Sequence, residues 1–266
     1  MRLLRQCRVL GPWGVSLALL LASQARAQLP DTLHLAATDW CPYTCVDQPD
    51  RPGIVAEYVR TVLAREQIDL RLTFLPWTRA VVEAQRGAVD GLLTAVLDEA
   101  PQLMFTQEPV ADYQDCLYTR SDSLWEYDGV ASLSEQRLGV VHGYGYSKQL
   151  NRYIARAPEK NVVALRGVNS TARLWDMLLL ERFDVFIQER RVLAWQAYSH
   201  QRDITAIRSA SCLAPQPFYL ALYPGNNYSR ELIGRLDRAF AAAENRELWL
   251  TLQARYLSQA EAAVPK

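Results

Sequence analysis

The chain has 266 residues, of which 50% are hydrophobic and 22% are charged, so it can build one large or two small globular domains. It carries 29 basic and 29 acidic residues, a balance that offers no support for nucleic acid or an anionic membrane as partner. No repeat or low-complexity tract stands out.

Residues 1–27 have the features of a secretory signal peptide. Arg2, Arg5 and Arg8 form a basic start, Val15–Ala22 is a short apolar run, and Ala25–Ala27 matches a cleavage site. The run is too short to span a bilayer, and a buried N-terminal helix is the alternative. We therefore expect a soluble exported protein located in the periplasm. Cleavage would leave 25 basic and 29 acidic residues, a net charge of −4.

Strand and helix patterns alternate along the remaining chain. The first cycle is expected as strand Thr32–Ala37, a helix with inward residues from Ile54 to Leu63, strand Leu70–Leu75, helix Thr78–Arg86, strand Asp90–Ala95 and strand Cys116–Arg120. The second is expected as strand Leu138–Val141, helix Ser147–Ala157, strand Val162–Leu165, a helix near Ser170, strand Asp184–Ile187 and helix Arg190–His200. Strand Phe218–Tyr223 and a helical region end the chain.

This alternation predicts mainly parallel sheets covered by helices. Two such units joined by two crossing segments would leave a cleft between them, and clefts between lobes are a preferred place for ligands.

Four cysteines follow the expected signal peptide: Cys41, Cys45, Cys116 and Cys212. An even number in an oxidising compartment favours disulfides. The C-x3-C spacing and the scattered histidines give no support to a metal site. A Cys41–Cys45 bond would close a tight loop, and a Cys116–Cys212 bond would tie two distant segments. This pairing is one of the three possible connectivities.

Several segments occur in a familiar order: GIVAEYVRTVLAREQI, FLPWTRAVVEAQRGAVDGLL, FTQEPV, SLSEQRLGVVHGYGY and LLLERFDVFIQERRVLAWQA. Together they resemble the bacterial extracellular solute-binding proteins of family 3, the periplasmic receptors of polar amino-acid transporters. The likeness covers nearly all of residues 32–258. It is strongest to a subgroup with C-P-Y-x-C after the first strand and L-P-W-x-R-A after the second.

The resemblance implies an α/β, two-lobe periplasmic-binding-protein fold of type II, with two mainly parallel sheets flanked by helices and a two-segment hinge. Residues 28–118 and 218–262 would form lobe 1, and residues 119–217 would form lobe 2. The lobes would close on a small polar solute by a hinge motion. The implied function is capture of that solute for an ABC permease or a membrane sensor, by a monomer without cofactor, metal or chemistry of its own.

Five candidate ligand contacts belong to lobe 1. The resemblance places Trp40 and Tyr43 after the first strand, Trp77 and Arg79 after the second, and Thr94 at the end of the third. Aromatic rings offer contact area and a face for a cation. Packing in the core or at the surface is the alternative for the aromatic residues, and a surface ion pair is the alternative for Arg79.

Four candidates belong to lobe 2. Tyr144 and Tyr146 lie in a glycine-containing loop at a helix start, where free N–H groups bind anions. Ser170 either contacts the ligand or caps a helix. Glu189 stands where the family has the aspartate that binds an amino group, which favours a cationic or amine-bearing ligand. A solvated glutamate at a helix start is the alternative.

The chain departs from the family at the arginine that clamps the ligand carboxylate. The segment LDEAPQ contains Glu99 there and no arginine. An ordinary α-amino acid ligand is therefore in doubt, unless Arg79 substitutes.

The alternative function is a periplasmic lyase similar to cyclohexadienyl dehydratases, with Glu189 as general acid if burial raised its pKa. Its substrate would also need carboxylate clamps. The chain contains no G-x-S-x-G, H-E-x-x-H or P-loop motif.

Overall fold

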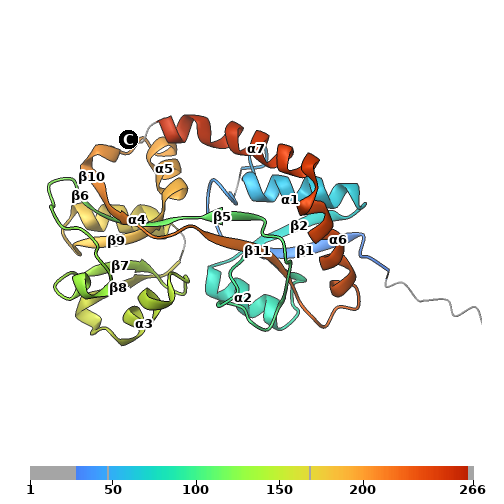
Figure 1. Cartoon of the computed structure of the whole chain (residues 1–266), viewed down its shortest axis with the longest axis horizontal. Coiled ribbons are helices and arrows are strands. Elements are labelled where there is room, and N and C mark those ends of the chain that lie inside the picture. The colour runs from blue at the N-terminus through green and yellow to red at the C-terminus, as the bar shows by residue number, and fades with distance from the viewer. Residues whose placement is uncertain (1–27, 47, 168, 263–266) are drawn as a thin grey trace, which may run out of the picture.

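The computed structural model describes residues 28–46, 48–167 and 169–262. The expected signal peptide, residues 1–27, lies outside the described residues. Within the described ranges, no helix combines the length and apolar character needed to cross a membrane. The chain forms two α/β lobes that lie side by side along the long axis of the molecule, which is horizontal in Figure 1.

The first lobe is built on a six-stranded sheet with four helices. Its spatial order is β2-β1-β3-β11-β4, and β5 pairs with β11. The strands are β1 (Thr32–Ala37), β2 (Asp69–Phe74), β3 (Gly91–Ala95), β4 (Met104–Phe105), β5 (Ala111–Tyr113) and β11 (Gln216–Leu222). The helices are α1 (Ile54–Arg65), α2 (Trp77–Gln85), α6 (Ser229–Ala241) and α7 (Ala243–Ala262). β1 is parallel to β2 and β3, whereas β11 is antiparallel to its neighbours.

The second lobe is built on a five-stranded sheet of order β10-β6-β9-β7-β8. The strands are β6 (Asp115–Arg120), β7 (Leu138–Val141), β8 (Val162–Leu165), β9 (Val185–Glu189) and β10 (Ile207–Cys212). The helices are α3 (Lys148–Arg156), α4 (Ser170–Leu179) and α5 (Arg190–Ser199), with short 3-10 turns at Val130–Leu133, Glu159–Asn161 and Ile204–Ala206. β7 is parallel to β8 and β9, and β6 is antiparallel to β9 and β10. Both sheets are therefore mixed: the β–α cycles are parallel and the strands at the crossings are antiparallel.

Hydrophobic periodicity explains the packing of the helices. In α1 the apolar residues recur at three- and four-residue intervals, and Ile54, Tyr58 and Val62 are buried together against the first sheet. In α4, Leu174 and Leu178 pack in the same way against the second sheet. Each lobe thus has apolar clusters of its own, and residues of α5 also pack into the cluster of the first lobe.

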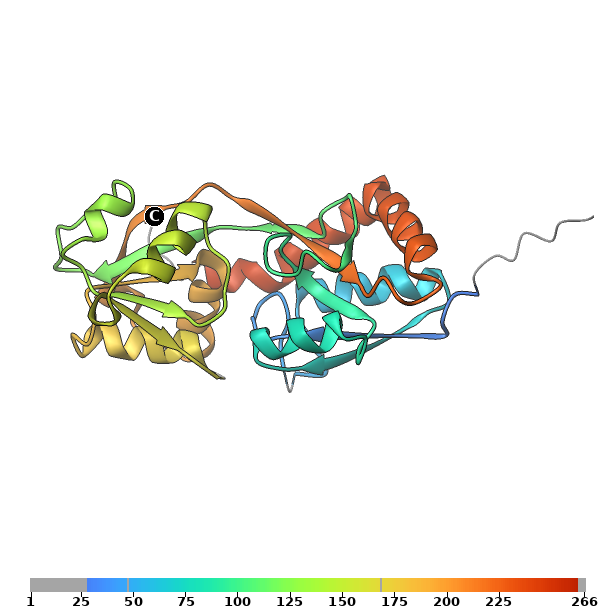
Figure 2. The same cartoon turned by 90° about the horizontal axis from the view of Figure 1, so that it is seen from below.

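Two extended crossings join the lobes, and both figures show them running side by side from β5 to β6 and from β10 to β11 (Figures 1 and 2). The first lies between Tyr113 and Asp115, because all of β6 pairs in the second sheet. We therefore propose boundaries at residue 114 and at residues 213–215, in place of the expected boundaries after residues 118 and 217. Helix α7 adds a third link, since it packs against α5 of the second lobe.

Each lobe contains one disulfide. Cys41 and Cys45 are bonded across the loop that follows β1, with their Cα atoms 4.8 Å apart. Cys116 and Cys212 are bonded between paired positions of β6 and β10. The second bond therefore joins the two crossing segments where they enter the second lobe. This is the pairing put forward from the sequence.

Candidate functional site

A small cavity of about 40 Å³ lies between the lobes. It is formed where β1, β3, β7 and β9 end, the place where open α/β sheets bind ligands. The first lobe lines it with Thr38, Trp40, Trp77, Thr94, Val96, Glu99, Tyr113 and Phe218, and the second lobe with Asp115, Tyr144, Gly145 and Gln188.

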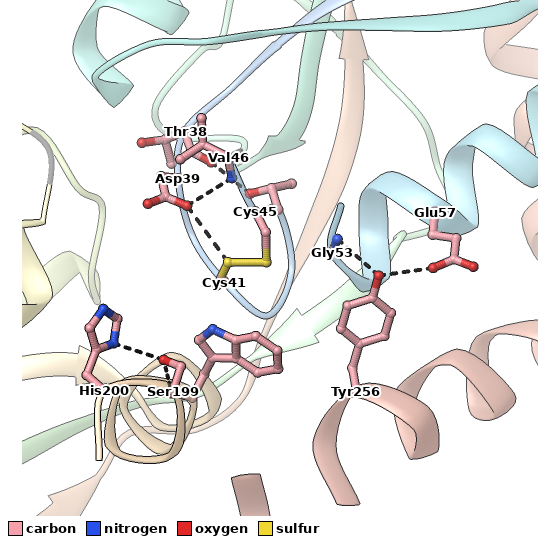
Figure 3. Close-up of a disulfide and its surroundings, with 12 residues drawn as sticks. Thr38, Asp39, Cys41, Cys45, Val46, Gly53, Glu57, Ser199, His200 and Tyr256 are labelled. Atoms are coloured by element: carbon pink, nitrogen blue, oxygen red, sulfur yellow. Dashed lines mark hydrogen bonds between the residues drawn. A yellow bond between two sulfur atoms is a disulfide. The ribbon is translucent and has the colours of Figure 1, made fainter. Parts of the chain in front are cut away.

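The disulfide loop after β1 positions Trp40. The Trp40 N–H donates to the Thr44 carbonyl at 2.8 Å, and the Thr44 hydroxyl donates to the Thr38 carbonyl at 2.8 Å. Figure 3 shows this loop closed by the Cys41–Cys45 bond. The Trp40 indole N–H is buried without an acceptor among the described residues. The ring therefore offers a ligand both a face and a hydrogen-bond donor.

The Glu99 carboxylate bridges the two lobes. Its Oε2 accepts a hydrogen bond from the Trp77 indole N–H at 3.0 Å, and its Oε1 accepts one from the Gly145 backbone N–H. Burial raises the pKa of Glu99 to about 7, although these two hydrogen bonds lower it in part. The Glu99 carboxylate thus accepts the hydrogen bond of the Gly145 N–H, which is then not free to bind a ligand.

Asp115 is a buried acid with no compensating partner. Its side chain lines the cavity, and the residue is 8% exposed. None of the hydrogen bonds or ion pairs found among the described residues involves its carboxylate. Burial raises the pKa of Asp115 well above its usual value, and the nearby charges of Glu189 and Glu99 raise it further. The cavity therefore contains an acid that lacks a positive neighbour.

Aromatic rings form much of the remaining wall. The Phe218 ring centroid lies 5.7 Å from that of Trp40, and the Tyr113 centroid lies 5.9 Å from it. Trp77 and Tyr144 complete this aromatic lining. No lysine, arginine or histidine of the described chain lines the cavity. The part of the chain that the structure describes also has no group of three or more His, Cys, Asp or Glu residues placed to hold a metal ion.

The turn from Gly143 to Gly145 makes the closing contact of the second lobe with the first. A Cβ atom on Gly145 would lie 2.6 Å from Glu99 Oε1, and one on Gly143 would lie 2.1 Å from Thr78 Cγ2. Between them, Tyr144 lines the cavity together with Thr38. Glycine permits both approaches without a shift of the neighbouring side chains, and the positive φ of Gly143 also favours glycine.

Four of the expected contacts lie together at the cavity: Trp40, Trp77, Thr94 and Tyr144. Ser170 lies instead at a neighbouring inter-lobe space of about 380 Å³, where its hydroxyl donates to the Gly167 carbonyl at 2.8 Å. It is the first residue of α4, and Asn169 holds the N-cap position.

Three expected contacts are placed elsewhere. Tyr43 is fully buried in the core of the first lobe. The Tyr146 hydroxyl accepts a hydrogen bond from the Val141 N–H at 3.0 Å and packs in the second lobe. The Arg79 side chain is 68% exposed and lies 3.6 Å from Glu83, one helical turn along α2. The Arg79 side chain thus lies outside the cavity in this structure.

Glu189 also differs from the expectation. Its residue is 0% exposed, and its Oε2 caps α5 by accepting from the Val192 N–H at 2.8 Å. Its Oε1 accepts from the Tyr43 hydroxyl at 3.1 Å and from the Gln114 N–H at 3.2 Å. Burial raises the pKa of Glu189 to about 7. The side chain does not line the cavity, so its geometry supports neither an amine contact nor a general acid.

The sequence analysis did not single out Asp115, Gln188, Tyr113 or Phe218, and it noted Glu99 only as a departure. One signal for Asp115 was present, since an acid opens the otherwise apolar segment of β6. The others required knowledge of the crossing strands.

The chain is similar in fold to solved two-lobe proteins. One is a histidine kinase sensor domain with similarity to periplasmic binding proteins (18% identity, 87% of this chain and 97% of that chain, TM-score 0.70). Another is an amino-acid ABC transporter substrate-binding protein from Streptococcus pneumoniae bound to L-arginine (16% identity, 89% and 97%, TM-score 0.66). A third is a solute receptor for L-cysteine of Neisseria gonorrhoeae (15% identity, 88% and 94%, TM-score 0.65).

No protein-family model matches the sequence, and no curated protein matches it. The structural similarity at these identities establishes the fold. The two-lobe periplasmic-binding-protein fold expected from the sequence is confirmed.

Proposed function

We propose that this protein is an exported solute-binding protein of the family 3 type, from the C-P-Y-x-C and L-P-W-x-R-A subgroup. It captures a small polar solute between its lobes and carries out no chemistry on it. The observation that supports this most is the cavity between the lobes, where the Gly143–Gly145 turn of one lobe closes over the strand ends of the other.

The cellular setting follows from the same proposal. The signal-like residues 1–27 support export to the periplasm. Proteins of similar fold include substrate-binding proteins of ABC transporters and a sensor domain of a histidine kinase. The partner of the closed form is accordingly an ABC permease or a membrane sensor, and the protein acts as a monomer.

The test uses the full chain, expressed with its own leader and purified from the periplasm, with the mature N-terminus measured by mass spectrometry. Thermal shifts are recorded against amino acids, polyamines, dipeptides, organic acids and aromatic amines. A ligand at a hundredfold excess over its Kd stabilises the folded state by about 2.7 kcal/mol, which such a screen detects. We expect at least one class to stabilise the protein and to reduce its radius of gyration in small-angle scattering.

A complete panel without stabilisation or compaction would refute the proposal. Steady consumption of a stabilising compound would also refute it, because the protein would then be an enzyme. Prephenate and arogenate are included in the panel to test the lyase alternative directly.

A further inference from the structure

The Asp115 carboxyl group meets no positive charge among the residues that the structure describes. Removing a carboxylate from water without a counter-ion is costly. Asp115 lines the cavity and has no hydrogen-bond or ion-pair partner among the described residues. The nearest charges that act on it, those of Glu189 and Glu99, are negative. A bound cation would remove this imbalance.

The walls of the cavity suit an organic cation. Trp40, Tyr113 and Phe218 are packed with ring centroids 5.7 to 6.4 Å apart. Aromatic faces attract ammonium groups, and the attraction is larger where water is excluded. No cationic side chain of the described residues lines the cavity and competes for these faces.

The same site disfavours a ligand carboxylate. Glu99 already accepts the hydrogen bonds of the Trp77 indole and the Gly145 N–H, two donors that an anionic group would need. A ligand carboxylate would also meet the charges of Glu99 and Asp115. Arg79, the one clamp suggested by the sequence, is directed into solvent.

We propose that the solute is a small organic cation without a carboxylate, namely an amine or quaternary ammonium compound, bound by Asp115 and the aromatic wall. This inference rests on the proposed solute-binding function and defines its substrate class. The cavity of about 40 Å³ accommodates the ammonium group. The rest of the ligand extends into the neighbouring space of about 380 Å³, which shares Thr38, Trp40 and Tyr144 with the cavity.

The experiment compares amino acids with the amines that lack only their carboxylate. The pairs are lysine with cadaverine, arginine with agmatine, and histidine with histamine. Tetramethylammonium and choline serve as quaternary probes. Affinities are measured by calorimetry and thermal shift on the mature protein. We expect at least one amine or quaternary probe to bind, and each amine that binds to do so at least tenfold more tightly than its amino acid.

Two variants test the assignment of the residues. Asp115→Asn keeps the shape of the side chain and should weaken amine binding at least tenfold without lowering the Tm of the unliganded protein. Glu99→Gln should reduce the preference for an amine over its amino acid. Asp69→Asn, which removes an exposed acid at the start of β2, is the control and should leave both quantities unchanged.

The outcomes separate the two proposals. Tighter binding of the amino acids would overturn the cation assignment and leave solute binding intact. Amine binding that is unchanged in Asp115→Asn would overturn the assignment to this carboxylate. Absence of binding by every compound in the wider panel would refute the proposed function itself.

Discussion

The Glu99 carboxylate of the first lobe accepts a hydrogen bond from the Gly145 N–H of the second lobe. The contact is possible because Gly145 has no Cβ atom, which would lie 2.6 Å from the carboxylate oxygen. These two residues connect the lobes at the cavity, and Gly145 belongs to the Gly143–Gly145 turn of the second lobe. Changes at either residue should therefore affect closure before they affect the cores of the lobes.

Gly145→Ala should hold the lobes apart. The added methyl group would displace the Glu99 carboxylate from the Gly145 N–H, so we expect at least tenfold weaker ligand binding and a larger radius of gyration with ligand present. Gly234→Ala in α6 is the matched control. Its Cβ atom would meet nothing closer than 3.8 Å, and alanine favours a helix. Equal scattering profiles for Gly145→Ala and the natural protein would contradict this role.

Stability should depend on pH through Glu99. Its pKa is raised from the usual 4.5 to about 7, so the folded, closed state binds a proton that the unfolded chain releases. The stabilisation is fully present below pH 4.5 and is lost as the pH rises through about 7. Burial also raises the pKa of Asp115 and that of Glu189, so these two acids contribute in the same direction.

Urea unfolding between pH 5 and pH 8 measures this effect. The natural protein should lose stability across this range, and Glu99 alone should account for a loss on the order of 2 kcal/mol. Glu99→Gln should show a smaller loss than the natural protein, because it no longer titrates. An identical pH dependence in both proteins would show that Glu99 is not the titrating group.

The two disulfides should differ in what they stabilise. The Cys116–Cys212 bond closes a 96-residue separation, and its loss should cost about 4.5 kcal/mol in a chain-entropy estimate. It also joins the two crossings, so the Cys116→Ala/Cys212→Ala variant should sample wider lobe openings by small-angle scattering. The Cys41–Cys45 bond closes a separation of 4 residues, and its loss should cost about 2 kcal/mol.

Ligand affinity should depend more on the Cys41–Cys45 bond than on the Cys116–Cys212 bond, the opposite of the order expected for stability. The Cys41–Cys45 loop positions Trp40 at the cavity, so Cys41→Ser/Cys45→Ser should weaken ligand binding more than the Cys116–Cys212 variant does. Calorimetry on both double variants below their melting temperatures provides the comparison. A larger loss of affinity in the hinge variant would show that hinge stiffness, rather than Trp40, controls binding.

Glu189→Gln should affect stability and leave affinity nearly unchanged. The carboxylate caps α5 and accepts three hydrogen bonds in the core, so a change there should cost about 1 to 2 kcal/mol.

Arg79→Ala should change neither stability nor ligand affinity by a measurable amount, because exposed ion pairs contribute little. A tenfold loss of affinity in either variant would restore that residue as a ligand contact.

Helix phase explains why one expected contact lies in the site and its neighbour does not. Trp77 and Arg79 are two residues apart in α2, and successive helical residues turn by about 100°, so the two side chains lie on nearly opposite faces. Trp77 faces the cavity and Arg79 faces solvent. The pattern L-P-W-x-R-A indicates a functional segment, but the docking of α2 decides which side chain is used.

A similar distinction separates Asp115 from Glu189. The two residues are directly paired between β6 and β9. Glu189 ends its strand, and its side chain caps the N-terminus of α5. Asp115 instead follows a crossing and lines the cavity. A pattern in one segment cannot show which of two paired acids keeps its hydrogen-bond partners.

The amino-acid sequence by itself determined the alternation of strands and helices, the two-lobe architecture and the strand ends at which aromatic residues gather. These features follow from periodicity and turn residues, which act over short stretches of chain. The tertiary structure alone decided which side chains share the cavity, because two crossings bring residues more than a hundred positions apart into contact. It also decided that Asp115 has no counter-charge among the described residues, since the neighbours of a buried group are set by packing between lobes rather than by its neighbours in sequence.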